Sequence, residues 1–307
     1  MAIIQKPLVL ADRAYYEGEG ARSHRGQKPT LLGESTPSSP RNESMRSASA
    51  CSHQIIMRLL RGFIDLNVRM SRAFDRLLPK TYSIDGNQDF VNTFAPYYIR
   101  PGLYVVDVGG GKRPFISVET KITLGLRVLG VDISQNELDR APKGAYDEVA
   151  CADITRYRGK GEADLVICQA VLEHVQDVQA ALASISSILR PGGVAVIFVP
   201  SRNAFFARLN LMLPEGLKRR LLHFIYPHMR EGQGFPSYYD RCTPRDFCNM
   251  AVRSGLVIGE NRYYFESAYF TFFFPAHMIW RLWVVLFRSL VGNQAAETFS
   301  LVMAKSQ

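Results

Sequence analysis

Short apolar segments alternate with helical patterns between residues 103 and 199, and this alternation limits the possible folds more than any other feature of the chain. Five such segments, each of strand length, lie at 103–108, 127–131, 147–151, 163–168 and 193–199. Strands that are apolar throughout and separated by helices are typical of a parallel sheet covered on both faces. Two later segments, at 256–258 and 299–304, bring the predicted sheet to seven strands.

The sequence on either side of these segments follows other patterns. Residues 11–54 hold few large aliphatic side chains and many Ser, Arg, Gly and Pro, so a disordered tail is predicted over 1–54. Apolar residues at three- and four-residue steps then predict helices over 55–100, which would cap the site. The remainder divides into a core at 101–200, an insertion at 201–242 and a second part of the core at 243–307, with an apolar helical insertion at 264–294.

Charge and cysteine content narrow the class of protein. The net charge of +9 is distributed as +5 over residues 1–100, −2 over 101–199 and +6 over 200–307. An acidic middle suits the binding of a cationic small molecule, and basic flanks suit phosphates, a lipid surface or nucleic acid. Five cysteines without a Cys-x-x-Cys pair indicate reduced thiols in the cytoplasm. The longest uncharged apolar segment near the C-terminus, 267–280, is too short for a conventional transmembrane helix.

A glycine-rich segment follows the first predicted strand, in the sequence Val105-Val-Asp-Val-Gly-Gly-Gly-Lys-Arg-Pro114. Glycines at a strand-to-helix turn let a ligand approach the backbone closely, although a run of glycines can also be only a tight turn. The dinucleotide fingerprint needs a third glycine where Pro114 stands, so this loop does not match pyrophosphate binding. Asp107 at the end of the strand favours a ligand with an amino or sulfonium group instead.

This Asp-x-Gly-x-Gly loop resembles that of the class I S-adenosylmethionine-dependent methyltransferases, over about residues 95–200 and more loosely over 240–307. The resemblance implies a doubly wound, Rossmann-like α/β fold with a seven-stranded, mostly parallel sheet that ends in an antiparallel strand. The site would lie at the carboxyl ends of the strands. The implied cofactor is S-adenosyl-L-methionine, with its methionine part held by Asp107, Val108, Gly109, Gly110 and Gly111.

Three further motifs of this family have counterparts in the expected order. Asp132 and Ile133 end the second strand, 25 residues after the acid of the glycine loop, where the family places the acid that binds the ribose hydroxyls. Asp153 and Ile154 match the acid and the apolar residue that contact the adenine, and Gln169 ends the fourth strand next to the cofactor. The resemblance implies that all five residues bind the cofactor.

The two acids also have simpler interpretations. Asp132 can cap a helix, because Ser134 and Glu137 follow it in a capping-box pattern. Asp153 can equally begin a turn. The sequence leaves both alternatives open.

The segment after the fourth strand contains Leu-Glu-His-Val at 172–175, which resembles the signature of the small-molecule methyltransferase subgroup. His174 is the candidate general base for removing a proton from an acceptor hydroxyl. The alternative is that His174 orients a loop or bonds backbone carbonyls. In the ubiquinone-pathway O-methyltransferases another acid precedes the Glu-His pair by three residues. Here that residue is Ala170, and no metal is expected.

The first insertion is a candidate for contact with the acceptor. Residues 205–213 and 217–226 are predicted to form basic amphipathic helices. Tyr238, Tyr239 and Asp240 follow in a polar and aromatic loop, and we interpret these three as candidate substrate contacts.

The second insertion combines a narrow cationic stripe with an apolar helix. His277, Arg281 and Arg288 fall within about 40 degrees of one another on a helical wheel, and most other residues of 275–291 are apolar, including both tryptophans. This pattern favours contact with a membrane surface or a lid over an apolar substrate. The alternative is a core helix whose arginines reach out to solvent.

Together these features predict a methyltransferase that moves a methyl group from S-adenosyl-L-methionine to a small-molecule, lipid-linked or glycan acceptor, with a hydroxyl as the expected target. The expected location is the cytoplasm or the inner face of a membrane. The alternatives are a non-catalytic S-adenosylmethionine-binding protein, a nucleic-acid methyltransferase and a nicotinamide-dependent oxidoreductase. Pro114 disfavours the last, and the core lacks the interleaved basic and aromatic residues that would favour nucleic acid as a partner.

Overall fold

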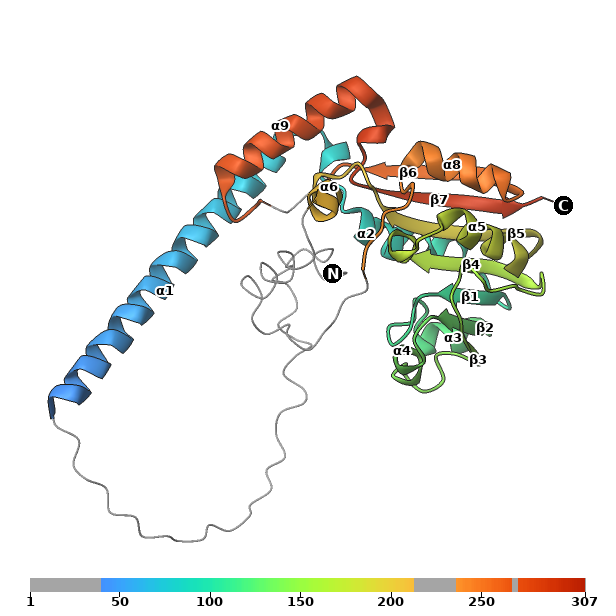
Figure 1. The fold of residues 1–307 in the computed structure, drawn as a ribbon, viewed down its shortest axis with the longest axis horizontal. Coiled ribbons are helices and arrows are strands. Elements are labelled where there is room, and N and C mark those ends of the chain that lie inside the picture. Colours follow the sequence, from blue (N-terminus) through green and yellow to red (C-terminus); the bar gives the residue numbers. More distant parts are fainter. Residues whose placement is uncertain (1–39, 213–235, 267–269, 307) are drawn as a thin grey trace, which may run out of the picture.

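The computed structural model describes residues 40–212, 236–266 and 270–306. Within those residues, seven strands form one sheet in the order β3-β2-β1-β4-β5-β7-β6 (Figure 1). The strands are β1 (Tyr104–Val108), β2 (Arg127–Asp132), β3 (Glu148–Cys151), β4 (Ala163–Gln169), β5 (Leu189–Pro200), β6 (Leu256–Tyr264) and β7 (Thr298–Lys305). The first five are parallel, and β7 runs antiparallel to both β5 and β6. The predicted doubly wound sheet is confirmed.

The helices surround this sheet. They are α1 (Pro40–Asp75), α2 (Gly86–Asp89), α3 (Val118–Leu124), α4 (Gln135–Asp139), α5 (Val178–Ile188), α6 (Phe205–Met212), α8 (Pro244–Arg253) and α9 (Phe274–Val291), with short 3₁₀ turns at Lys80–Tyr82, Pro96–Tyr98, Leu172–His174 and Gly292–Ala295 and a π turn at Phe90–Phe94. Two of them begin at side chains that cap the first turn. The side chain of Thr243 accepts a hydrogen bond from the N–H of Asp246 at the start of α8, and Ser134 caps α4 in the same way through Glu137.

Both faces of the sheet are covered, as the apolar strands predicted. Val106 and Val108 belong to the core cluster that packs against α5 and α8, whereas Val105 belongs to the cluster on the opposite face. On that second face the sheet is covered by Phe90 and Phe94, from the helical segment that follows α2. The alternation of side chains along one strand thus fills two separate cores.

Two predicted boundaries differ from the structure. Helix α1 begins at Pro40, so residues 40–54 are helical and are not part of a disordered tail as predicted. Residues 1–39 lie outside the described residues. Strand β6 extends to Tyr264, well beyond the predicted end at 258. The prediction stopped short because the second half of this edge strand is polar and follows a register shift. Apolar content alone does not reveal such a segment.

Helix α9 lies along the C-terminal part of α1, whose N-terminal part projects away from the sheet (Figure 1). A buried cluster joins the two helices. Asp75 of α1 accepts hydrogen bonds from Nε of Arg281 at 2.9 Å and interacts with Nε2 of His277 at 3.0 Å. Arg281 also donates to the carbonyl oxygens of Phe265 and Tyr82. The arginine is only 1% exposed.

The cationic stripe of α9 therefore faces inward, which corrects the prediction of a stripe directed toward solvent or a membrane. Its third member, Arg288, lies over the ring of Phe265 at 4.2 Å. Asp75 and backbone carbonyls supply polar partners for Arg281 and His277 on this face, and Arg288 has aromatic rings beside it. Hydrophobic residues of α9 are left on the outside instead, namely Ile279, Leu282, Trp283, Leu286 and Leu290. None of the helices in the described ranges combines the length and apolar content needed to cross a membrane.

Candidate active site

The glycine-rich loop after β1 lies against two carboxylates. Gly109 and Gly111 adopt positive φ angles of 73° and 47°, which favour glycine. A Cβ atom on Gly110 would stand 2.3 Å from Oδ2 of Asp107, and one on Gly111 would stand 2.9 Å from Oδ2 of Asp132. Side chains at these positions would fill the space beside both acids, so only glycines keep it open.

Asp107 is buried at the end of β1, and one of its oxygens accepts two hydrogen bonds. Its Oδ2 accepts from the backbone N–H of Phe115 at 2.8 Å and from the hydroxyl of Tyr146 at 3.2 Å. Burial raises the pKa of Asp107 to about 6, although both hydrogen bonds oppose this shift. The carboxyl group is therefore mostly ionised at neutral pH, as the partner of a cationic group must be.

Asp132 ends β2, the strand beside β1. Its Oδ1 accepts a hydrogen bond from the N–H of Ser134 at 2.9 Å, and burial raises its pKa. The cap of α4 is Ser134, so the capping interpretation of Asp132 does not describe the structure. Ile133, the next residue, is 59% exposed and offers an apolar surface at the same edge. Ribose binding by Asp132 stays a prediction.

The third and fourth motifs take part in local structure at this edge. Oδ1 of Asp153 accepts from both the N–H and the hydroxyl of Thr155, each at 2.9 Å, so this acid does begin a turn. Ile154 is buried in the core between the sheet and α5. Nε2 of Gln169 donates to Oδ1 of Asn87 at 2.7 Å, which ties the end of β4 to α2. Adenine contacts by Asp153 and Ile154, and a cofactor contact by Gln169, stay predictions.

Three residues outside the sequence motifs shape the loop. Tyr146 bonds both Asp107 and the carbonyl oxygen of Gly111. Ala170, directly after β4, has a φ of 53°, a strained conformation for a residue with a Cβ atom. Val171 packs so closely on the loop that a Cβ on Gly109 would lie 2.3 Å from it. A single sequence carries no signal for these contacts, because each depends on chain segments meeting in space.

His174 lies at the same edge, in the 3₁₀ turn after β4. Its Nδ1 is 3.0 Å from the carbonyl oxygen of Pro236 and 3.2 Å from the hydroxyl of Ser237. Its Nε2 is buried and lies 3.7 Å from the carboxylate of Glu173. This geometry favours the alternative interpretation, in which His174 orients the loop that contains Pro236. The general-base role stays a prediction.

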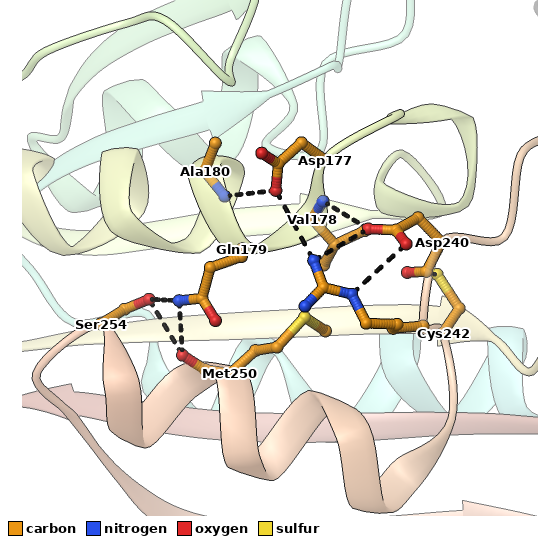
Figure 2. A network of polar contacts seen from close by, with 9 residues as sticks. Asp177, Val178, Gln179, Ala180, Asp240, Cys242, Met250 and Ser254 are labelled. Atoms are coloured by element: carbon orange, nitrogen blue, oxygen red, sulfur yellow. Dashed lines mark hydrogen bonds and ion pairs between the residues drawn. The ribbon is translucent and has the colours of Figure 1, made fainter.

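The predicted substrate loop is attached to this turn through its backbone. The N–H groups of Tyr238 and Tyr239 both donate to the carbonyl oxygen of Glu173, at 2.8 and 3.0 Å. Tyr239 is 1% exposed and packs in the core, and Oδ2 of Asp240 accepts from the N–H of Val178 at the start of α5 (Figure 2). Tyr239 and Asp240 therefore have structural contacts, Tyr238 is exposed and Asp240 is half-buried, and contact of these residues with a substrate stays a prediction. The predicted helix at 217–226 lies outside the described residues.

These residues fit S-adenosylmethionine. An ionised acid stands beside an open glycine loop, and a second acid ends the neighbouring strand, which suits an amino group and a pair of ribose hydroxyls. The order β3-β2-β1-β4-β5-β7-β6, with this loop after β1, defines the class I methyltransferase domain, a class that uses S-adenosylmethionine as its methyl donor.

Comparison with known proteins assigns the chain to the same class of enzyme. The chain belongs to the methyltransferase domain family, whose model matches residues 75–259. It is 29% identical over 169 residues to a ubiquinone biosynthesis O-methyltransferase of Cupriavidus pinatubonensis, covering 52% of this chain and 63% of that protein. It is 32% identical over 178 residues to the protein of the same name in Thiobacillus denitrificans, covering 56% and 70%.

The matched region thus spans less than two thirds of the Cupriavidus protein's length. Among solved structures, an S-adenosylmethionine-dependent methyltransferase from Mesorhizobium loti overlaps 67% of this chain and 92% of its own, with a TM-score of 0.43 and 18% identity.

Proposed function

We propose that this protein is an S-adenosylmethionine-dependent methyltransferase that methylates a hydroxyl group on a small acceptor with an apolar part. The observation that carries the proposal is the glycine loop packed against Asp107 and Asp132 at the carboxyl edge of the sheet. When bound, S-adenosylmethionine supplies a methyl group whose bond to sulfur breaks as the acceptor oxygen bonds to its carbon, while the hydroxyl proton leaves to a base or to water.

The chain's own contribution is to bind, orient and exclude water. Asp107 holds a positive charge near the loop, and Asp132 holds two hydroxyls at the next strand. The hydrogen bond from Gln169 to Asn87 keeps α2 over the end of β4, so the helical segment after it shields this edge from solvent. His174 keeps the 236–240 loop in place through the carbonyl oxygen of Pro236.

The names of the relatives support a small-molecule acceptor and an oxygen target, because both relatives described above are named O-methyltransferases. The aromatic residues of α6 and α9 support an acceptor with an apolar part. The test is incubation of the protein with S-adenosylmethionine labelled in its methyl group and a lipid and glycan extract, followed by identification of the labelled product. A non-catalytic protein would bind the cofactor and label nothing. A nucleic-acid methyltransferase would label RNA or DNA instead, with affinity that falls steeply as salt rises.

The same protein is proposed to work at an anionic membrane surface. Hydrophobic side chains are also exposed on α1 (Leu59, Leu60, Phe63, Leu66 and Met70), the helix along which α9 lies (Figure 1). Exposed cations accompany them on α1, namely Arg58, Arg61, Arg69 and Arg72, and Arg76 follows directly after the helix. Apolar side chains among arginines are the combination that binds the headgroup region of an anionic bilayer.

Sedimentation with vesicles tests this location. The protein should sediment with vesicles that contain phosphatidylserine and less with vesicles of phosphatidylcholine alone. The double variant Leu282→Ser and Leu286→Ser should bind several-fold more weakly, since both side chains are exposed on α9. Val252→Ser on α8 is the matched control, because Val252 is equally exposed but lies on another surface. Equal binding by all three proteins would exclude the proposed surface.

A further inference from the structure

A cavity of about 550 Å³ lies between α6 and α9. Phe205 and Phe270 contribute aromatic rings to it, and the ring of Phe205 lies 4.8 Å from that of Trp280. Trp283 stacks on Phe287 with ring centroids 5.9 Å apart, and both residues line the cavity. The size is that of a small-molecule site, and the lining is mostly apolar.

The cavity follows one side of α9 for three turns. The lining residues of this helix are Ala276, Ile279, Trp280, Trp283, Val284 and Phe287. They recur at three- and four-residue steps, and with a rise of about 1.5 Å per residue they span roughly 16 Å. An apolar lining of this length suits an extended chain better than a compact ring system. Ile279 and Trp283 are also exposed, so the cavity is continuous with the apolar outer face.

One carboxyl group stands in the wall opposite α9. Glu297 is 5% exposed, and its Oε2 has no hydrogen-bond partner within the part of the chain that the structure describes. Burial raises the pKa of Glu297 to about 8, with a further rise from Glu266 and opposing effects from Arg281 and the N–H of Phe205. Glu297 is therefore protonated at neutral pH, and it offers a neutral hydrogen-bonding group to an uncharged ligand.

Part of the cavity lining lies at the same edge of the sheet as the glycine loop, because Asn203 and Phe205 follow β5 and Glu297 precedes β7. The N–H of Ser201, just after β5, donates to the carbonyl oxygen of Glu297, just before β7. From β7 to β1 the sheet passes through β5 and β4, which is three strand spacings or about 14 Å. A molecule whose reacting end lies above β4 can therefore extend an apolar chain into the cavity.

We propose that the cavity between α6 and α9 binds the apolar chain of the methyl acceptor, with Glu297 as the hydrogen-bonding group in its wall. The proposal rests on the methyltransferase function argued above. The occupant is an uncharged, extended chain that is mostly hydrocarbon and carries a polar atom that can bond Glu297, and it enters where Ile279 and Trp283 are exposed. The cavity thereby selects acceptors by the length of their chain and leaves the cofactor loop unchanged.

The two tryptophans of the chain, Trp280 and Trp283, both line this cavity, so their fluorescence reports its occupancy. Bromoundecanol, whose bromine quenches tryptophan on contact, should quench the full-length protein saturably, and bromohexanol should bind at least several-fold more weakly. Ala276→Phe fills the cavity and should weaken bromoundecanol binding by about tenfold or more. Leu282→Phe places the same aromatic side chain on the exposed side of α9 and should leave binding unchanged.

Two results would overturn the proposal. Quenching that is not saturable, or that is equal in wild type and Ala276→Phe, would place the alkanol on the outer surface of α9. Equal affinity for the long and the short alkanol would contradict selection by chain length, and this comparison uses the wild-type protein alone. Calorimetry with S-adenosylhomocysteine on the same proteins keeps the two proposals distinguishable. If the alkanol does not bind in the cavity but S-adenosylhomocysteine binds normally, only the cavity proposal is wrong. If the alkanol quenches as expected but S-adenosylhomocysteine does not bind, the proposed methyltransferase function is wrong.

Discussion

The carboxyl edge of the sheet has two halves that are built in different ways. Over β1 and β2 the site is polar, and it consists of strand ends and a glycine loop that lie close together in sequence. Over β5 and β7 it is aromatic, and it consists of side chains from α6, α9 and the start of β7, which are far apart in sequence. The first half depends mainly on backbone geometry, and the second depends on how distant helices pack.

The buried carboxyl groups of the two halves differ in the same way. Asp107 has the N–H of Phe115 and the hydroxyl of Tyr146 as donors, and its pKa rises only to about 6. Burial raises the pKa of Glu297 to about 8, and the charge of Glu266 adds to this rise. At neutral pH one is ionised and the other protonated, so one half suits a cationic ligand and the other an uncharged one. The two halves should therefore respond independently to substitution.

The largest effect is expected where α1 meets α9. Asp75→Ala leaves Arg281 buried without its carboxylate, which should lower the free energy of unfolding by about 3 kcal/mol. Urea unfolding measures the loss, and Asp65→Ala, an exposed acid on the same helix, is the control. Affinity for S-adenosylhomocysteine should change less than twofold. A parallel loss of nucleoside affinity would show that the two halves are coupled.

Substitution in the polar half should have the next largest effect. If Asp132 accepts hydrogen bonds from two ribose hydroxyls, as proposed, Asp132→Ala should lower the affinity for S-adenosylhomocysteine about 100-fold by calorimetry. Asp139→Ala, an exposed acid on α4, should leave affinity unchanged. Bromoundecanol should quench Asp132→Ala as it quenches the wild type. Normal nucleoside affinity in Asp132→Ala would instead assign this acid only to the N–H of Ser134.

The sequence was sufficient to predict the polar half. Five apolar strands in a parallel order bring Asp107 and Asp132 to one edge, because neighbouring strands of such a sheet end together. The contacts of Tyr146 and Val171 were not predictable in this way, since they depend on the turn geometry after β1 and β4. Tyr239 and Asp240 also have structural contacts that the sequence did not reveal, because aromatic and acidic side chains in a loop serve packing as readily as binding.

The orientation of α9 could not be predicted for a different reason. A helix with one cationic stripe and an apolar remainder can turn either side inward, and the hydrophobic effect alone favours burying the apolar side. Asp75, some 200 residues earlier in the chain, decides the outcome by pairing with Arg281 and His277. No pattern within α9 contains that information. The aromatic cavity, which depends on this orientation, was therefore outside the reach of sequence reasoning.

A smaller effect, and one that depends on pH, is expected in the aromatic half. The pKa of Glu297 is raised from 4.5 to about 8, so the native state binds a proton more tightly than the unfolded chain. This stability is fully present below about pH 4.5 and is lost as pH rises through about 8. Glu297→Gln should flatten this decline and be more stable than wild type at pH 8.5, on the order of 2 kcal/mol. Thermal unfolding across this range measures it, with Glu260→Gln as the exposed control. Greater instability of Glu297→Gln at high pH would mean that Glu297 is ionised and paired with Arg281.

The smallest effect is expected at His174, which lies between the two halves. If the ring only holds the carbonyl oxygen of Pro236, His174→Ala should lower methyl incorporation into a lipid extract by roughly tenfold or less, about the value of one hydrogen bond. His174→Asn, whose amide can donate to the same carbonyl, should recover most of the loss, and the pH dependence of incorporation should keep its shape. A general base would behave differently: both variants would lose about 10²–10⁴-fold, and the acidic limb of the profile would disappear. The pair of variants therefore decides between positioning and proton transfer even though both remove the imidazole.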